Sequence, residues 1–117
     1  MKTITICGSV TRTPKLYWDE YAQEQTLLGN LVFMANVWGL RDWLHSQEGE
    51  KKKELLDRIH KEKILKSDEV HVLRANGYIG SFTQSEIDFA IKHGKPIVFR
   101  DYYGVAESVD SDSGRKE

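Results

Sequence analysis

Two short segments of the 117-residue chain hold the residue types that bind anions and sugars. The first, Gly8-Ser9-Val10-Thr11-Arg12, combines small residues, hydroxyls and a guanidinium. Small residues let a backbone approach an anion closely, and the hydroxyls and Arg12 could bind phosphate. The segment is neither a P-loop nor a complete dinucleotide fingerprint, so an ordinary polar turn explains it equally well.

The second segment, Thr83-Gln84-Ser85-Glu86, matches a capping box. In that motif Thr83 caps a helix and Glu86 reaches back to the N–H of the cap residue. This structural role would by itself explain both residues, and the pattern favours it. A carboxylate near a helix start also stays ionised, so Glu86 could instead act as a nucleophile or bind a hydroxyl.

His60 and Cys7 are the other candidates for chemistry. His60 lies one helical turn from Leu56 and Ile64, where a packed histidine is more common than a catalytic one. Cys7 ends an apolar run, and we expect a buried, inert thiol. The remaining histidines show no metal-ligand spacing with one another: His45, His71 and His93. The sequence therefore predicts no metal and no cofactor.

Strand and helix patterns alternate along the chain and position these residues. We expect strands over residues 3–7, 31–35, 69–73 and 96–100, and helices over 14–28, 51–67 and 83–93. Residues 36–50 lack a regular apolar pattern, which predicts a long loop with one helical turn at 40–44. The polar residues 106–117 are expected to form a disordered tail.

The apolar positions predict which faces of the first two helices are buried. Thr13 is the expected N-cap of the first helix. The expected core residues of that helix are Leu16, Tyr17, Tyr21, Leu27 and Leu28. Those of the second helix are Leu55, Leu56, Ile59, Ile64 and Leu65.

This alternation predicts a single α/β domain over residues 1–105. Its parallel sheet of four to five strands would be covered by helices on both faces, in the flavodoxin-like, Rossmann-like order 2-1-3-4. Ligands bind such sheets outside the carboxyl ends of the strands, where the strand order reverses. We therefore expect Gly8 and Ser9 to lie beside residues 76–83.

Charge and hydropathy exclude several classes of protein. The net charge of −1 argues against a general nucleic-acid or membrane-surface binder, because both classes carry a basic excess. No apolar stretch is long enough to span a bilayer, and the first residues lack a signal-peptide core. We expect a cytoplasmic protein.

Several motifs resemble those of nucleoside 2-deoxyribosyltransferase-like proteins. They are Ile4-Thr5-Ile6-Cys7-Gly8-Ser9, Ser67-Asp68-Glu69-Val70, the segment from Gly77 to Ile87, and Gly94-Lys95-Pro96-Ile97. The Gly77-Tyr78-Ile79-Gly80 loop resembles that of a compact branch of this superfamily. The resemblance covers residues 3–99, apart from residues 30–50.

The resemblance implies a retaining reaction at C1′ of a deoxynucleoside or nucleoside 5′-monophosphate. Glu86 matches the family's nucleophilic glutamate, and Thr83 matches a hydroxyl near the sugar or phosphate. The expected substrate-binding set comes from the two loops: Gly8, Ser9, Arg12, Tyr78, Gly80, Ser81 and Thr83. His60 stands where the family usually carries an aspartate, and it could protonate the leaving base.

The substitution of His60 for that aspartate leaves two functions open. One is an N-glycosidase or 2-deoxyribosyltransferase, and the other is a nucleotide- or ADP-ribose-type sensor that binds without cleaving. Related enzymes build their sites between subunits, so we expect a homodimer or a larger homo-oligomer. Trp38 and Trp43 are the candidate interface residues.

Overall fold

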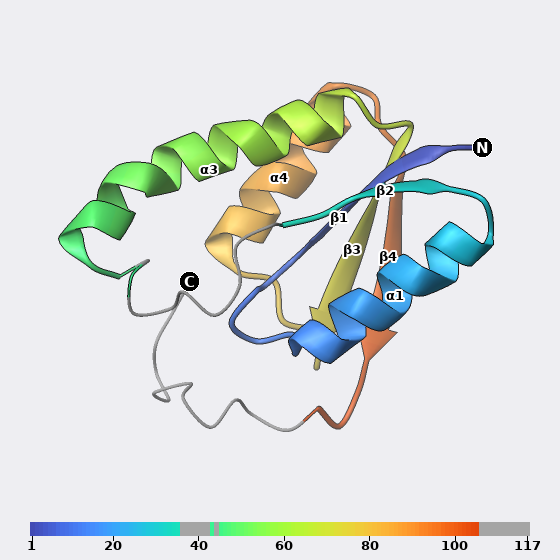
Figure 1. Cartoon of the computed structure of the whole chain (residues 1–117), viewed down its shortest axis with the longest axis horizontal. Helices are drawn as coiled ribbons and strands as arrows, with labels where there is room; N and C mark the ends of the chain where they lie inside the picture. The colour runs from blue at the N-terminus through green and yellow to red at the C-terminus, as the bar shows by residue number, and fades with distance from the viewer. Residues whose placement is uncertain (36–42, 44, 106–117) are drawn as a thin grey trace.

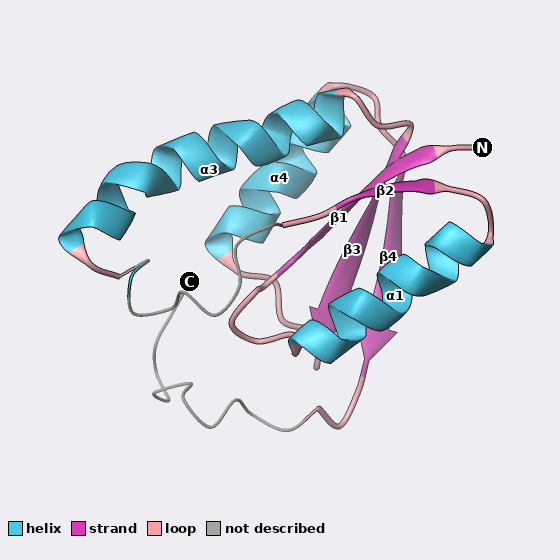
Figure 2. Cartoon of the chain, in the orientation of Figure 1, coloured by secondary structure: helices cyan, strands magenta, loops and turns pink. Residues whose placement is uncertain are grey.

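The computed structural model describes residues 1–35, 43 and 45–105 of the chain. Strands and helices alternate along it, as Figures 1 and 2 show. The strands are β1 (Thr3–Gly8), β2 (Leu31–Phe33), β3 (Glu69–Ala75) and β4 (Ile97–Tyr102). The helices are α1 (Lys15–Leu27), α3 (Gln47–Leu65) and α4 (Ser81–Lys92). The predicted order of elements is confirmed.

The strands form one parallel sheet in the order β2-β1-β3-β4. In its register Thr5 pairs with Phe33 on one side and Val70 on the other, and Val70 pairs with Ile97. The two inner strands, β1 and β3, end side by side at the carboxyl edge. The predicted flavodoxin-like order, 2-1-3-4, is confirmed with four strands.

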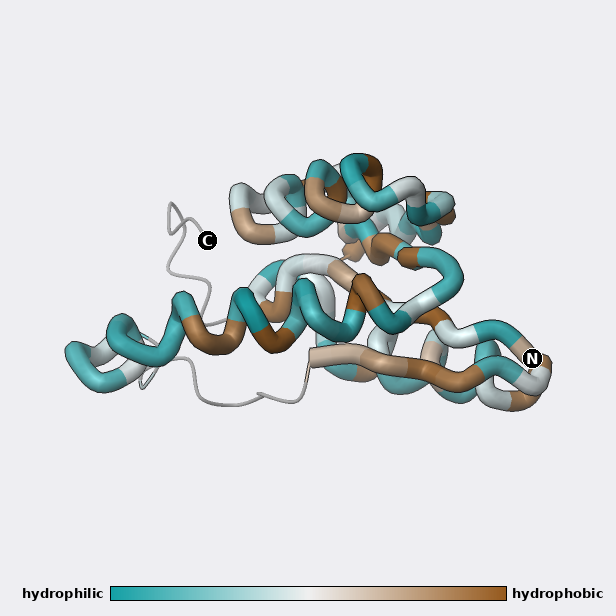
Figure 3. Tube along the Cα trace, turned by 90° about the horizontal axis from the view of Figure 1, so that it is seen from above, coloured by the Kyte–Doolittle hydropathy of each residue, from teal (hydrophilic) through white to brown (hydrophobic). Residues whose placement is uncertain are grey.

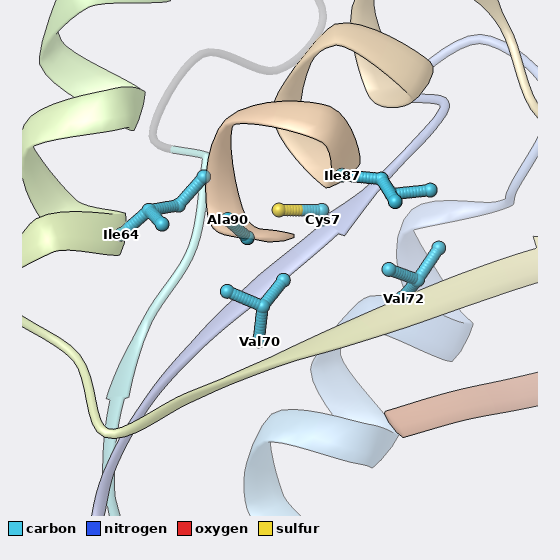
Figure 4. Packing of buried hydrophobic residues seen from close by; sticks show 6 residues of the cluster. All are labelled: Cys7, Ile64, Val70, Val72, Ile87 and Ala90. Atoms are coloured by element: carbon cyan, nitrogen blue, oxygen red, sulfur yellow. The ribbon is translucent and has the colours of Figure 1, made fainter. Parts of the chain in front are cut away.

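Helices cover both faces of this sheet, because successive side chains of β1 and β3 point to opposite sides. One face packs against α3 and α4 through the cluster of Cys7, Ile64, Val70, Val72, Ile87 and Ala90, which Figure 4 shows. The other face packs against α1 through Ile4, Ile6, Trp18, Tyr21 and Leu73. The prediction of helices on both faces is confirmed.

The buried face of α1 differs from the prediction. Trp18, Tyr21 and Gln25 are buried, and they follow a helical stripe of their own at i, i+3 and i+7. The predicted core residues Leu16, Leu27 and Leu28 are instead 63%, 79% and 69% exposed. The larger aromatic side chains cover the sheet. The N-cap is Pro14, without a side-chain cap, so the prediction of Thr13 was wrong.

Helix α3 begins at Gln47, four residues before the predicted start. Ser46 is its N-cap and accepts a hydrogen bond from the N–H of Gly49 at 3.1 Å. The N-terminal part of α3 extends beyond the sheet (Figures 1 and 3). Apolar side chains there have less of the sheet to pack against. Leu55, in the first half of the helix, is therefore exposed. The predicted core residues Ile59 and Leu65, in its second half, are exposed as well.

Three sequence-based predictions concern residues that the structure does not describe. They are the tail over residues 106–117, the role of Trp38, and most of the helical turn expected at 40–44. Within the described ranges, no helix combines the length and the continuous apolar character that a bilayer span requires.

Two isoleucines on neighbouring helices test the position of the core. Ile64 on α3 is 0% exposed, whereas Ile91 on α4 is 61% exposed. We expect Ile64→Ala to lower the free energy of unfolding by about 2–5 kcal/mol in urea denaturation, because it leaves a cavity. The matched variant Ile91→Ala should change it by less than about 1 kcal/mol. Equal losses for the two variants would contradict the arrangement of α3 over the sheet.

Candidate functional site

The loops that follow β1 and β3 meet at the carboxyl edge of the sheet. The guanidinium carbon of Arg12 lies 4.4 Å from the centre of the Tyr78 ring, so the two loops are in direct contact. Strands β1 and β3 approach closely here because Gly8 lacks a side chain. A Cβ at Gly8 would lie 2.9 Å from the carbonyl oxygen of Leu73 and 3.2 Å from the Trp18 ring.

The turn after β1 is held by its own serine. Ser9 is buried, and its Oγ accepts a hydrogen bond from the backbone N–H of Arg12 at 3.0 Å. The same hydroxyl lies 3.2 Å from Oγ1 of Thr11, and the Ser9 carbonyl accepts from the N–H of Thr13 at 3.1 Å. The polar-turn interpretation of this segment therefore has direct structural support, while ligand binding by Ser9 and Arg12 remains a prediction.

The start of α4 corrects the capping-box prediction. The helix begins at Ser81, and its N-cap is Gly80, which has no side chain that could accept a capping hydrogen bond. Thr83 is therefore the third residue of the helix and Glu86 the sixth. A capping box requires them at the N-cap and at the third helical residue, so the motif does not form. Gly80 has the extended backbone of an N-cap residue, and the helix therefore begins two residues before the predicted start at Thr83.

Thr83 is buried in this first turn, at 2% exposure. Its Oγ1 has no hydrogen-bond partner among the residues that the structure describes. A buried hydroxyl in this state costs free energy unless a ligand or water satisfies it. Thr83 is thus compatible with ligand binding, although its predicted role as the helix cap is wrong.

Glu86 and His60 come together between α4 and α3. The His60 Nε2 atom lies 3.8 Å from Oε1 of Glu86, and the two side chains are 11% and 12% exposed. Cys7 of β1 is the third member of this cluster, with its Sγ 3.3 Å from His60 Nε2. The ligand-type atoms of all three side chains lie within 4.8 Å of one another.

The sequence did not indicate the contact of Cys7 with His60 and Glu86. Its burial was predicted correctly, since Cys7 is 0% exposed. Its partners, however, lie far away in the sequence, on helices whose packing no local pattern specifies. A lone cysteine at a strand end carries no signal of such a contact.

Burial sets the charge of two members of the cluster. Desolvation lowers the pKa of His60 to about 4, with a further contribution from the charge of Lys63 and opposition from Asp57. Burial also raises the pKa of the Cys7 thiol well above its ordinary value, and Glu86 reinforces that shift. Near pH 7 the imidazole is therefore neutral and the thiol protonated. A low pKa does not suit His60 to act as a charged proton donor.

Two lysines of α3 fix the helix that carries His60. Lys61 Nζ lies 3.0 Å from Oδ2 of Asp57 and donates to Oγ of Ser85 on α4, also at 3.0 Å. Lys63 Nζ donates to the carbonyl oxygen of Met34, just after β2, at 2.8 Å. These contacts connect α3 to α4 and to the end of β2, and so hold His60 close to Glu86.

A second buried polar group lies on the opposite face of the sheet. The Tyr21 hydroxyl is 2.5 Å from Nδ1 of His71, whose Nε2 is 2.8 Å from Oε1 of Glu69. Glu69 begins β3, so this group extends towards the amino edge, away from the two loops. It connects α1 to β3, and we assign it a structural role.

The fold is similar to that of a solved 2-deoxyribosyltransferase from the psychrotolerant bacterium Bacillus psychrosaccharolyticus. The TM-score is 0.65 at 17% sequence identity, and the match covers 92% of this chain and 77% of that chain. That enzyme is described as a suitable biocatalyst for the synthesis of antiviral and antitumoral nucleosides. No protein-family model matches this sequence, and no curated protein sequence is significantly similar to it.

This similarity establishes the fold and supports the predicted resemblance at that level. The assignment to a branch with a Gly-Tyr-Ile-Gly loop remains a prediction.

The buried hydroxyl of Thr83 can be tested against that of Thr5. Thr5 Oγ1 is also buried but lies 2.5 Å from Oγ of Ser67, in a hydrogen bond. In the ligand-free protein, we expect Thr83→Val to raise the free energy of unfolding by about 1 kcal/mol, because it removes an unsatisfied group. Thr5→Val should lower it by about 1–2 kcal/mol. A similar loss in both variants, measured by urea denaturation, would show that Thr83 has a partner.

Proposed function

We propose that the protein cleaves or transfers the glycosyl group of a deoxynucleoside or nucleoside 5′-monophosphate, with Glu86 as the nucleophile. The position of Glu86 is the observation that supports this most. Its carboxylate is almost buried on α4, beside His60 and Cys7, in a protein with the fold of a 2-deoxyribosyltransferase. A carboxylate held in such an apolar site is only weakly solvated and positioned for attack.

The reaction would proceed in two displacements at one carbon. A Glu86 oxygen attacks C1′ while the C1′–N bond breaks, through an oxocarbenium-like transition state. The departing base takes its proton from solvent, since His60 is neutral near pH 7. Water or the nitrogen of a second base then attacks C1′, and the bond to Glu86 breaks. Water gives hydrolysis, and a second base gives transfer.

The two loops supply the groups that would hold the substrate. The N-cap of α4 is Gly80, which has no side chain to accept a hydrogen bond, and the backbone N–H groups of a helix start favour an anion such as phosphate. Arg12, packed on Tyr78, would add a positive charge on the side of the β1 loop. Ser81 and the unsatisfied hydroxyl of Thr83 would then bond to the phosphate or sugar.

The exposed apolar side chains of α3 support the proposal of a homo-oligomer. Leu55 and Ile59 are 36% and 44% exposed on a helix that extends beyond the sheet (Figure 3), and Trp43 is 39% exposed. Leu55 and Ile59 are four positions apart and so share one face of α3, and exposed apolar side chains on one face favour contact with a second copy of the chain.

A nucleotide sensor that binds without cleaving is the second candidate. The low pKa of His60, about 4, favours this candidate. His60 matches the family's proton-handling aspartate, yet near pH 7 it is an uncharged imidazole. Calorimetry would identify a sensor by binding of a nucleotide or of ADP-ribose without any turnover.

Release of free base tests the enzymatic proposal. The protein is incubated with a panel of deoxynucleosides, nucleosides and their 5′-monophosphates, with and without an acceptor base, and products are separated by chromatography. We expect base release from at least one substrate, and a loss of at least about a thousand-fold in Glu86→Gln, which removes the nucleophile. The exposed Glu62 on α3 provides the matched control, because Glu62→Gln should retain activity.

Two results would overturn the enzymatic proposal. One is the absence of base release from every substrate by the wild-type protein. The other is a Glu86→Gln variant that is as active as Glu62→Gln.

A further inference from the structure

We propose that Cys7, His60 and Glu86 form a binding site for one divalent transition-metal ion, with Zn²⁺ the ion that the ligand set favours. The sequence predicted no metal, because none of the spacings between histidines indicated one. The three residues instead come from three elements, β1, α3 and α4, which meet only in the folded protein.

The distances between the three side chains suit a tetrahedral ion. Zinc binds sulfur at about 2.3 Å and nitrogen or oxygen at about 2.0–2.2 Å, so neighbouring ligand atoms lie about 3.3–3.6 Å apart. The observed separations are 3.3 Å from Cys7 Sγ to His60 Nε2 and 3.8 Å from that nitrogen to Glu86 Oε1. The remaining separation, from Cys7 Sγ to a Glu86 carboxylate oxygen, is at most 4.8 Å, so a bound ion would draw these two side chains closer together.

The chemistry of the three donors selects the ion. Thiolate and imidazole bind zinc in preference to magnesium or calcium, which take oxygen ligands. A Cys7 thiolate and the Glu86 carboxylate together carry two negative charges, which balance a divalent ion in this apolar surround. A metal-bound imidazole is neutral and a metal-bound cysteine is a thiolate, so binding of the ion would release the proton of the Cys7 thiol.

The surroundings of the cluster favour a site that is formed before the ion binds. Cys7 lies at the base, among Ile64, Ile87 and Ala90, as Figure 4 shows. The bond from Lys61 to Ser85 holds α3 and α4 together beside it. His60 and Glu86 retain 11% and 12% exposure, which gives an ion access from their side. A water molecule could then occupy the fourth position, as in zinc sites with three protein ligands.

An ion at this site would block the proposed reaction. It would bind the Glu86 oxygen that attacks C1′, so Zn²⁺ would inhibit base release. This consequence rests on the proposed function, whereas metal binding itself does not. Binding can therefore be tested on a protein that shows no activity towards nucleosides.

Cobalt(II) is the probe, because its absorption reports both ligand type and geometry. The full-length reduced protein, treated with chelator and desalted, is titrated with Co²⁺. We expect one equivalent to bind, with a near-ultraviolet thiolate-to-cobalt band and the visible bands of a tetrahedral ion. Cys7 is the only cysteine of the chain, so a thiolate band can come from no other residue. Absence of that band in the wild-type protein would overturn the proposal.

Variants identify the other two ligands. His60→Gln and Glu86→Gln should each weaken Co²⁺ binding by at least about 100-fold, as loss of a direct ligand requires. The exposed His93 provides the matched control, because His93→Gln should bind as tightly as the wild type. Zn²⁺ should displace Co²⁺ and abolish the bands. Unchanged affinity in both ligand variants, with folding verified by circular dichroism, would overturn the site.

Discussion

A carboxylate that is almost enclosed by helices costs free energy unless its neighbours compensate it, and Glu86 is in that position. Its neighbours are the thiol of Cys7 and the imidazole of His60, which the same burial keeps uncharged near pH 7. The cluster can exist only where β1, α3 and α4 pack together. Both proposals for this site follow from that constraint, because a weakly solvated carboxylate can attack carbon or bind a metal ion.

The order of the strands brings the other groups to the same edge. β1 and β3 are adjacent and parallel, so their loops emerge together. Because Gly8 has no side chain, β1 can lie close to Leu73 of β3 and to the Trp18 ring of α1. Arg12 then packs on Tyr78 across the two loops. The start of α4, whose N-cap is Gly80, completes this edge. Positive groups and a buried carboxylate thus belong to one region of the fold.

Local patterns predicted the strands and their order because alternating strands and helices leave few right-handed arrangements. They failed where tertiary contacts decide. The spacing of Thr83 and Glu86 matched a cap, yet Gly80 begins α4 earlier. The predicted buried face of α1 included Leu16 and Leu27, yet Trp18 and Tyr21 cover the sheet. Cys7 and His60 lie 53 positions apart, and no periodicity reports such a contact.

A crystal structure with a bound deoxynucleoside 5′-monophosphate tests the central claim, that Glu86 is positioned to react with the sugar. Glu86→Gln would be used if the wild type consumes the ligand. Our account places C1′ about 3–3.5 Å from a side-chain atom of residue 86, with the phosphate at the first turn of α4. A ligand bound elsewhere, or a sugar separated from residue 86 by the ring of His60, would contradict it.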